Sequence, residues 1–280
     1  MHLGAILLNI DRKKRHRIDM FPRQNAKNIE GNRYLLGDDT FCFECHSKLA
    51  CFTHCCHNAD MYLYPYDIIR LKRRLGMTSE AFLERHTITA LRDMPHFPNV
   101  MLKMSDRPGN PCTFLSEAGC SVYEDRPYAC RAYPLEPAMY GDEGGQTNLH
   151  CYVVRHGHCL GHRQKRTWTA RQWMADQQMT AYNEINARWA RIASRFQNNP
   201  FGPRGIDSPA MKMTFMASYN MDTFRRFVFD SSFLSKFDLL PERLAAIRDS
   251  DSELLLLGFD WIARFLFGDG PLRQKDRQER

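Results

Sequence analysis

The sequence has no long hydrophobic run and none of the short motifs that mark the common cofactor-dependent and hydrolytic enzymes. No stretch of its 280 residues approaches the roughly 18 consecutive apolar residues of a membrane helix. A glycine-rich phosphate loop, a nucleophile elbow and a zinc-protease helix are missing, as is the three-cysteine spacing of many radical enzymes. The familiar nucleotide-binding and hydrolase classes therefore receive no support.

The N-terminus lacks the order of features that is typical of an export signal. A short apolar run from His2 to Ile10 precedes the basic stretch from Asp11 to Arg17, whereas a secretory signal has its charge first. A disulfide framework is therefore not expected from the cysteines. We expect a protein of the reducing cytoplasm, where clustered thiols more often hold metal.

Charge of one sign does not dominate the chain. Its 39 lysines and arginines and 32 acidic residues give a net charge of +7, and the two signs are largely interspersed. No aromatic-rich RNA motif or recognition helix accompanies this charge. Nucleic acid is therefore not an expected partner.

Cysteine is abundant, and half of the ten cysteines lie between Phe41 and Cys56. A thiolate is a metal ligand, and Cys42 and Cys45 have the spacing that can direct two sulfurs to one ion from a tight turn. Redox pairs share this spacing, but they open a helix after a strand, a context that is not expected here. The candidate metal ligands are Cys42, Cys45, Cys51, Cys55, Cys56, Cys112, Cys120, Cys130, Cys151 and Cys159.

The number of metal centres stays open. Cys55 and Cys56 are awkward ligands for one tetrahedral ion, because neighbouring side chains diverge in most backbone conformations. Eight thiolates would complete two four-cysteine sites, or one site could take four and leave the rest structural. An iron–sulfur cluster prefers sulfur ligands alone, whereas zinc also accepts a nearby histidine. The nearby histidines are His46, His54, His57, His150, His156, His158 and His162.

Two arginines flank Cys130 in a proline-containing stretch. A thiolate-bound metal leaves a net negative site, which Arg126 and Arg131 could offset by charge and by hydrogen bonds to sulfur. We therefore predict that both arginines contribute to cofactor binding. The alternative is that they lie on the surface while Pro127 and Pro134 turn the chain.

The cysteine pattern resembles a known family. The vicinal Cys55 and Cys56, the later Cys112 and Cys120, and the stretch from Arg126 to Pro134 are similar to the YkgJ-type cysteine-cluster family of bacterial proteins. The resemblance covers about residues 41–160 and implies chelation of zinc or iron. Members are often described as iron–sulfur oxidoreductases, and a related module in flagellin lysine N-methylases implies a redox or methyl-transfer role. Five residues separate Cys45 from Cys51, which departs from the shortest form of the motif.

We expect an α+β fold that is mainly helical. An irregular cysteine-rich half with short strands (residues 40–165) is followed by a helical half (166–270), with a flexible leader at 1–39, in which Met20 is an alternative start, and a tail at 271–280. Residues 134–150 contain Pro137, Gly141, Gly144 and Gly145 and are expected to form a surface loop. Short strands are expected at 100–104, 112–115 and 120–123. Helices are predicted at 65–76, from Thr78, at 169–196, 221–229, 241–248 and 253–267.

Three functions fit these features. The first is a cytoplasmic iron–sulfur protein for electron transfer or a redox or methylation-linked reaction, with a redox or other protein as its unidentified partner. The second is a zinc-stabilised structural or interaction protein without catalysis. The third, a zinc enzyme, would need a general base that we cannot assign from the sequence. We favour the iron–sulfur cluster as cofactor, with zinc as the alternative.

Overall fold

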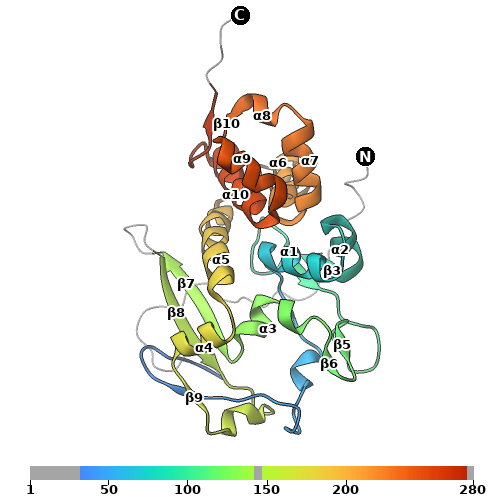
Figure 1. The fold of residues 1–280 in the computed structure, drawn as a ribbon, viewed down its shortest axis with the longest axis vertical. Coiled ribbons are helices and arrows are strands. Elements are labelled where there is room, and N and C mark those ends of the chain that lie inside the picture. The colour runs from blue at the N-terminus through green and yellow to red at the C-terminus, as the bar shows by residue number, and fades with distance from the viewer. Residues whose placement is uncertain (1–31, 142–146, 276–280) are drawn as a thin grey trace, which may run out of the picture.

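The protein is an α+β fold in which helices predominate and the strands are short, as predicted (Figure 1). The computed structural model describes residues 32–141 and 147–275, so most of the expected leader, with Met20, lies outside the described residues. The helices are α1 (Pro65–Arg74), α2 (Ser79–His86), α3 (Tyr128–Ala132), α4 (Ala170–Asp176), α5 (Thr180–Ala193), α6 (Pro209–Tyr219), α7 (Met221–Asp230), α8 (Phe233–Lys236), α9 (Pro241–Asp249) and α10 (Asp251–Phe267). Short 3-10 turns are η1 (His54–Cys56), η2 (Tyr123–Asp125), η3 (Leu160–Arg163), η4 (Ser194–Asn198) and η5 (Gly205–Asp207). None of the helices in the described ranges is long and apolar enough to cross a membrane.

The strands form small antiparallel sheets. The largest has the order β1-β8-β7, and the others are the pairs β2–β9, β3–β4, β5–β6 and β10–β11. The strands are β1 (Arg33–Leu35), β2 (Phe41–Cys42), β3 (Thr87–Ala90), β4 (Asn99–Leu102), β5 (Leu115–Ser116), β6 (Gly119–Cys120), β7 (Leu135–Gly141), β8 (Thr147–Val154), β9 (Thr167–Trp168), β10 (Phe237–Asp238) and β11 (Arg273–Gln274).

The first two helices form as their end signals predict. Pro65 opens α1, the side chain of Asp67 accepts a hydrogen bond from the Tyr64 N–H, and Gly76 follows the helix with φ near +62°. The Thr78 hydroxyl caps α2 by accepting from the Ala81 N–H. Both helices bury their apolar faces in the main core.

The prediction of a surface loop at 134–150 is wrong. β7 and β8 pair there from Leu135↔Val153 to Gly141↔Thr147, with the connection at 142–146 outside the described residues. Pro137 favoured the loop prediction, but β7 is an edge strand, where proline is tolerated because one side of the strand needs no ladder hydrogen bond. The end of the expected flexible leader is also part of this sheet. β1 (Arg33–Leu35) pairs with β8, and the next residue, Leu36, is buried.

The long helix predicted at 169–196 is two helices. Thr169 caps α4 and forms the predicted capping box with Gln172. Gln178 then has φ near +53°, which ends the helical path before α5 begins. The periodicity of the apolar residues continues across the break, so the pattern alone does not reveal it.

Other elements differ from expectation in the C-terminal part. α6 was missed, because its buried residues surround the helix instead of forming one stripe. Phe265, predicted on the buried face of α10, is 45% exposed and stacks on Trp261. Arg273 and Gln274, expected in a frayed tail, form β11 against β10, and the adjacent Leu272 is buried.

The main core is shared by the two halves of the chain. One hydrophobic cluster runs from Leu63 in the cysteine-rich half to Leu272 near the C-terminus. A smaller cluster around Phe41, Phe43 and Trp168 supports the β1-β8-β7 sheet. Figure 1 shows α6 to α10 gathered at one end of the molecule, with β9 and the blue segment near residue 50 at the other end and α5 between them.

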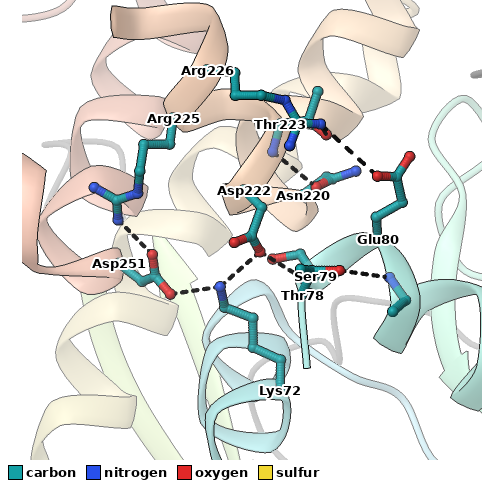
Figure 2. Close-up of polar contacts among 11 residues, drawn as sticks. Lys72, Thr78, Ser79, Glu80, Asn220, Asp222, Thr223, Arg225, Arg226 and Asp251 are labelled. Atoms are coloured by element: carbon teal, nitrogen blue, oxygen red, sulfur yellow. Dashed lines mark hydrogen bonds and ion pairs between the residues drawn. The ribbon is translucent and has the colours of Figure 1, made fainter. Parts of the chain in front are cut away.

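An ion-pair network joins α1 and α2 to the C-terminal helices (Figure 2). The Lys72 ammonium, nearly buried, lies 2.8 Å from a carboxylate oxygen of Asp222 and 2.8 Å from one of Asp251. Asp222 also accepts from the N–H of Ser79 at the start of α2, and Arg225 pairs with Asp251. One lysine therefore fixes α1 against both α7 and α10.

Candidate metal centre

The vicinal cysteines lie in the short turn η1, next to the segment that carries Cys112. The Cys112 N–H donates to the Cys56 carbonyl at 2.7 Å, and His57 bridges to Pro111. Cys120 lies in the β5–β6 hairpin, where it pairs with Leu115, whose N–H donates to the Cys112 carbonyl. Segments far apart in the sequence therefore bring Cys56, Cys112 and Cys120 to one place.

Cys130 lies in α3, whose N-terminus is held by a buried carboxylate. Asp67 accepts from the N–H groups of Tyr64 and Tyr128, at 2.8 Å each, and so ties α3 to the start of α1. The Cys130 sulfur lies 3.6 Å from the sulfur of Met61. Asp67 was missed by the sequence analysis, because an acidic residue in a first helical turn already has a local explanation.

The turn η3 packs against the first cysteines. The Leu160 N–H donates to the Cys51 sulfur at 3.2 Å, and the Glu44 N–H donates to the Gly161 carbonyl at 3.1 Å. A Cβ on Gly161 would lie 2.7 Å from the ring of Phe43, so glycine permits this close approach. The contact places Cys159 beside the segment that carries Cys45 and Cys51.

The gathered thiols raise one another's pKa values. Burial and the neighbouring Cys55, Cys159 and Cys51 raise the pKa of Cys45 to about 11. Burial, then repulsion from Cys112, Cys55 and Cys120, raises the pKa of Cys130. Negative charge on several of these thiols is therefore unfavourable unless a cation offsets it.

The two vicinal cysteines, Cys55 and Cys56, have pKa values that shift in opposite directions. The Cys55 sulfur accepts a hydrogen bond from the Cys56 thiol, which lowers the pKa of Cys55 to about 7. The same hydrogen bond, followed by burial, raises the pKa of Cys56. Cys55 is therefore the thiol of the pair that ionises more readily, while Cys56 keeps the shared proton.

The donors fit a thiolate-held metal in kind, although they do not enclose one ion. Backbone contacts bring together the segments that carry eight of the thiols, and ionising several of these thiols at once would be unfavourable without a cation. Within 32–141 and 147–275, no group of three or more His, Cys, Asp or Glu side chains is arranged so that it could hold a metal ion. Binding would require the thiols to turn toward the ion. These eight are Cys45, Cys51, Cys55, Cys56, Cys112, Cys120, Cys130 and Cys159.

The other two predicted ligands have different surroundings. Cys42 lies in β2, and its sulfur is 3.6 Å from the Thr167 hydroxyl of β9. Cys151 lies in β8 and is buried in the smaller hydrophobic cluster. The structure brings neither of them into the contacts that join the eight.

Arg126 and Arg131 bond to oxygen atoms. Arg131 donates to the carbonyls of Gln177 and Glu124, and Arg126 donates to the Gln177 side chain and the Tyr123 carbonyl. Both arginines therefore bond to Gln177, at the break between α4 and α5. Burial lowers the pKa of Arg126. A negative charge on Cys130 would raise this pKa, so Arg126 is close enough to interact electrostatically with the Cys130 thiol.

Comparison with protein families agrees with this gathering of cysteines. Residues 44–172 match the family model CxxCxxCC, described as a "putative zinc- or iron-chelating domain". This segment belongs to the YkgJ-type cysteine-cluster family. The match supports metal binding through the cysteines of this YkgJ-type domain, and it includes all eight gathered cysteines but begins after Cys42. No curated protein and no solved structure gives a significant match.

The buried Asp67 predicts a pH dependence of stability. Burial raises the pKa of Asp67 to about 7, although hydrogen bonds from Tyr64 and Tyr128 and the charge of Arg131 oppose the rise. The folded state therefore holds the proton more tightly than the unfolded chain. The resulting stabilisation is complete below the unfolded value of 3.8 and is lost as the pH rises through about 7.

We expect the unfolding free energy of the wild type, relative to Asp67→Asn, to fall by more than about 1 kcal/mol between about pH 5 and about pH 8. Urea denaturation across this range measures it. The exposed Asp38→Asn variant is the control and should follow the wild type. A constant difference between wild type and Asp67→Asn would show that Asp67 is already ionised at pH 5.

Proposed function

We propose that the YkgJ-type domain holds an iron–sulfur centre through the eight gathered cysteines and serves in electron transfer, or in a redox or methylation-linked reaction, in the cytoplasm. The single observation that carries the proposal is the supply of eight sulfur donors from separate segments of the chain. Iron–sulfur clusters are held by cysteine thiolates and supply one-electron transfer when bound. All ten cysteines are free, and a reducing compartment would keep them available as ligands.

The histidines around the thiols support sulfur-only ligation. The ring centroids of His54 and His158 are 4.4 Å apart, and His156 stacks against His158 at 5.4 Å. Tyr133 also stacks with His156. The imidazole of His162 packs on the edge of Phe43. The Nδ1 of His156 also lies 3.0 Å from the Asn32 side-chain nitrogen, and the Nε2 of His162 lies 3.4 Å from the Tyr133 hydroxyl, so these ring nitrogens already have partners and the thiols are the simpler ligand set.

Backbone amides near the thiols would tune such a centre. The N–H of Leu160 points at the Cys51 sulfur, and the N–H of Phe114 lies 3.4 Å from the Cys112 sulfur. Hydrogen bonds to ligating sulfur stabilise the additional negative charge of the reduced state and so raise the reduction potential. This chain therefore offers both the ligands and the donors that an electron-transfer centre uses.

A zinc-stabilised structural domain is the second candidate, and the small size of the local sheets favours it. β5 and β6 have two residues each, and η1 contains no buried residue. Such loops gain little from hydrophobic burial, so a metal would supply folding free energy that the cysteine region otherwise lacks.

Metal and acid-labile sulfide analysis distinguishes the two candidates. Protein purified without oxygen is expected to contain iron with a matching amount of sulfide, and a broad visible absorption that bleaches on reduction. Zinc without sulfide would replace the iron–sulfur proposal with the structural one. If folded protein with reduced thiols contained neither iron nor zinc, this result would contradict metal binding altogether.

A further inference from the structure

Two segments that meet beside the first cysteines contain no acidic residue. Neither aspartate nor glutamate occurs at 45–59 or at 144–175. The two segments are in contact, because the ring centroids of His54 and His158 are 4.4 Å apart. Figure 1 shows β9 and the blue segment near residue 50 at the end of the molecule away from α6 to α10. The charged side chains that these segments place at this end are therefore all basic.

Three cationic side chains on these segments are exposed and available to another molecule. Among the residues at 32–141 and 147–275, no carboxylate lies within ion-pair distance of Lys48, Arg163 or Lys165. Many cations elsewhere in the protein are paired, for example Lys72 and Arg188. The charges of the three side chains are therefore screened only by salt, and they attract an approaching anionic surface.

Two further exposed arginines rest on aromatic rings. The guanidinium of Arg155 lies 5.1 Å from the ring centroid of Tyr34, and that of Arg166 lies 4.1 Å from Trp168. Asp176 lies 3.8 Å from Arg166, but this pair is weak because 55% and 40% of the two side chains are exposed, with Arg166 the more exposed. Stacking on a ring holds a guanidinium in place without cancelling its charge.

A row of exposed imidazole rings belongs to the same two segments. His158 lies between His54, at 4.4 Å, and His156, at 5.4 Å, as measured between ring centroids. Aromatic rings with charged residues around them are typical of the centre and the rim of a protein–protein interface. His54 precedes Cys55 and His158 precedes Cys159, so a molecule on this row reaches the edge of the candidate metal centre.

We propose that this basic surface is the docking site of a small electron-carrier protein that has an acidic face. The basic surface consists of the histidine row and the five cations Lys48, Arg155, Arg163, Lys165 and Arg166. The proposal rests on the proposed function for the transfer of electrons, and it adds the chemistry of the partner and the place where the partner binds.

The size and the position of the basic surface favour this partner. Electron-transfer complexes have small interfaces and use complementary charge to speed the encounter. Five cations around a short row of rings match such an interface, whereas a nucleic acid requires a longer basic stripe along its phosphates. Cys45 and Cys55 beside the basic surface are exposed, so docking here brings the carrier close to the thiols.

Binding of a plant-type [2Fe–2S] ferredoxin, a small acidic electron carrier, tests the docking. Calorimetric titration of the full chain is expected to show binding at about 10 mM salt that weakens at least about tenfold at about 150 mM, where the Debye length is about 8 Å. Cytochrome c, a basic electron carrier, should not bind at either salt concentration. Absence of ferredoxin binding at low salt would overturn the proposal.

Removal of charge from the basic surface tests whether it is the site of binding. The triple variant Lys48→Gln, Arg163→Gln, Lys165→Gln is expected to bind the ferredoxin about tenfold more weakly than the wild type at low salt. All three side chains are exposed, so the variant should keep the helical circular dichroism signal. Unchanged affinity would show that the ferredoxin binds elsewhere.

A second triple variant removes the same charge from another part of the surface. Arg73, Arg74 and Arg85 are exposed near the C-terminal ends of α1 and α2. The variant Arg73→Gln, Arg74→Gln, Arg85→Gln should bind the ferredoxin within about threefold of the wild type. An equal loss of affinity in both triple variants would show that only the net charge matters, and it would overturn the proposal.

An oligothymidylate tests nucleic acid as the occupant instead. We expect it to bind the two triple variants equally, because non-specific attraction follows the net charge. If it bound the wild type more tightly than the ferredoxin does, and lost affinity only in the variant with Lys48→Gln, the basic surface would be a nucleic-acid surface and the proposal would fail.

The outcomes separate this proposal from the proposed function. Iron with sulfide in the purified protein, together with equal ferredoxin binding by the two triple variants, would support the iron–sulfur function and reject this docking site. Zinc without sulfide, together with a loss of binding only in the variant with Lys48→Gln, would reject the iron–sulfur function and support a docking site for an acidic protein.

Discussion

Replacing Gly258 with alanine is expected to destabilise the protein by about 3 kcal/mol. Gly258 is buried in α10 where this helix crosses α6, and a Cβ there would lie 2.2 Å from the carbonyl oxygen of Ala217 and 3.3 Å from Phe224. The obstacle is backbone, so the helices must separate to admit the methyl group. The higher helix propensity of alanine returns only about 1 kcal/mol of this cost.

Urea denaturation of the metal-free protein measures the effect of Gly258→Ala. Gly157→Ala is the matched control, since nothing lies within 4 Å of its added Cβ, and we expect its unfolding free energy to stay within about 0.5 kcal/mol of the wild type. The folded fraction of Gly258→Ala should bind metal normally, because Gly258 lies outside the YkgJ-type domain. Unchanged stability would mean that α6 and α10 can move apart without loss of packing.

The variant Lys72→Met is expected to lose about 3 kcal/mol of stability. The methionine fills the space of the lysine chain, but it leaves the carboxylates of Asp222 and Asp251, with 29% and 24% of their side chains exposed, facing one another without the intervening cation (Figure 2). Removal of one partner from a nearly buried ion pair is costly, because the remaining charge keeps its desolvation penalty.

A nearby surface pair provides the control for Lys72→Met. Arg226 and Glu80 are 3.9 Å apart with 60% and 48% of their side chains exposed, so Arg226→Met should change stability by less than about 1 kcal/mol. Equal effects of the two variants, measured by urea denaturation, would show that burial does not set the strength of the network.

The loss of stability caused by Lys72→Met should be smaller at acidic pH. Burial tends to raise the pKa of Asp222, but hydrogen bonds from Lys72 and Ser79 outweigh it and hold the pKa below the ordinary value of 3.8. A lowered pKa means that the stabilisation is present above 3.8 and is lost as the pH falls through the folded value. The gap between wild type and Lys72→Met should therefore narrow below about pH 4.

Local signals predicted the helix ends better than the breaks within helical regions. Thr78, Thr169 and Ser250 each accept a backbone N–H as N-caps, because capping depends on residues within one turn of each other. The break at Gln178 has no such signal. It lies at the place where Arg126 and Arg131 bond to Gln177, and that contact joins residues far apart in the sequence.

The β7–β8 hairpin shows why glycine and proline misled the prediction. The sequence analysis treated Pro137 and Gly141 as loop residues, since both are unfavourable in a central strand. Their effect depends on the position of the strand in its sheet, and the sheet order β1-β8-β7 places β7 at an edge. Sheet order is a tertiary property, so a local pattern cannot supply it.

The sequence by itself predicted thiolate ligation of a metal, and only the tertiary structure showed which cysteines lie near one another. Clustered cysteines predict metal ligation because thiolate chemistry belongs to the residue, and the vicinal pair with the Arg126–Pro134 stretch was enough to indicate the family. The separation of Cys42 and Cys151 from the other eight, and the partners of Asp67, Lys72 and the two arginines, depend on contacts between distant segments. Such contacts form where buried groups must satisfy their hydrogen bonds and charges, a condition that exists only once the chain has folded.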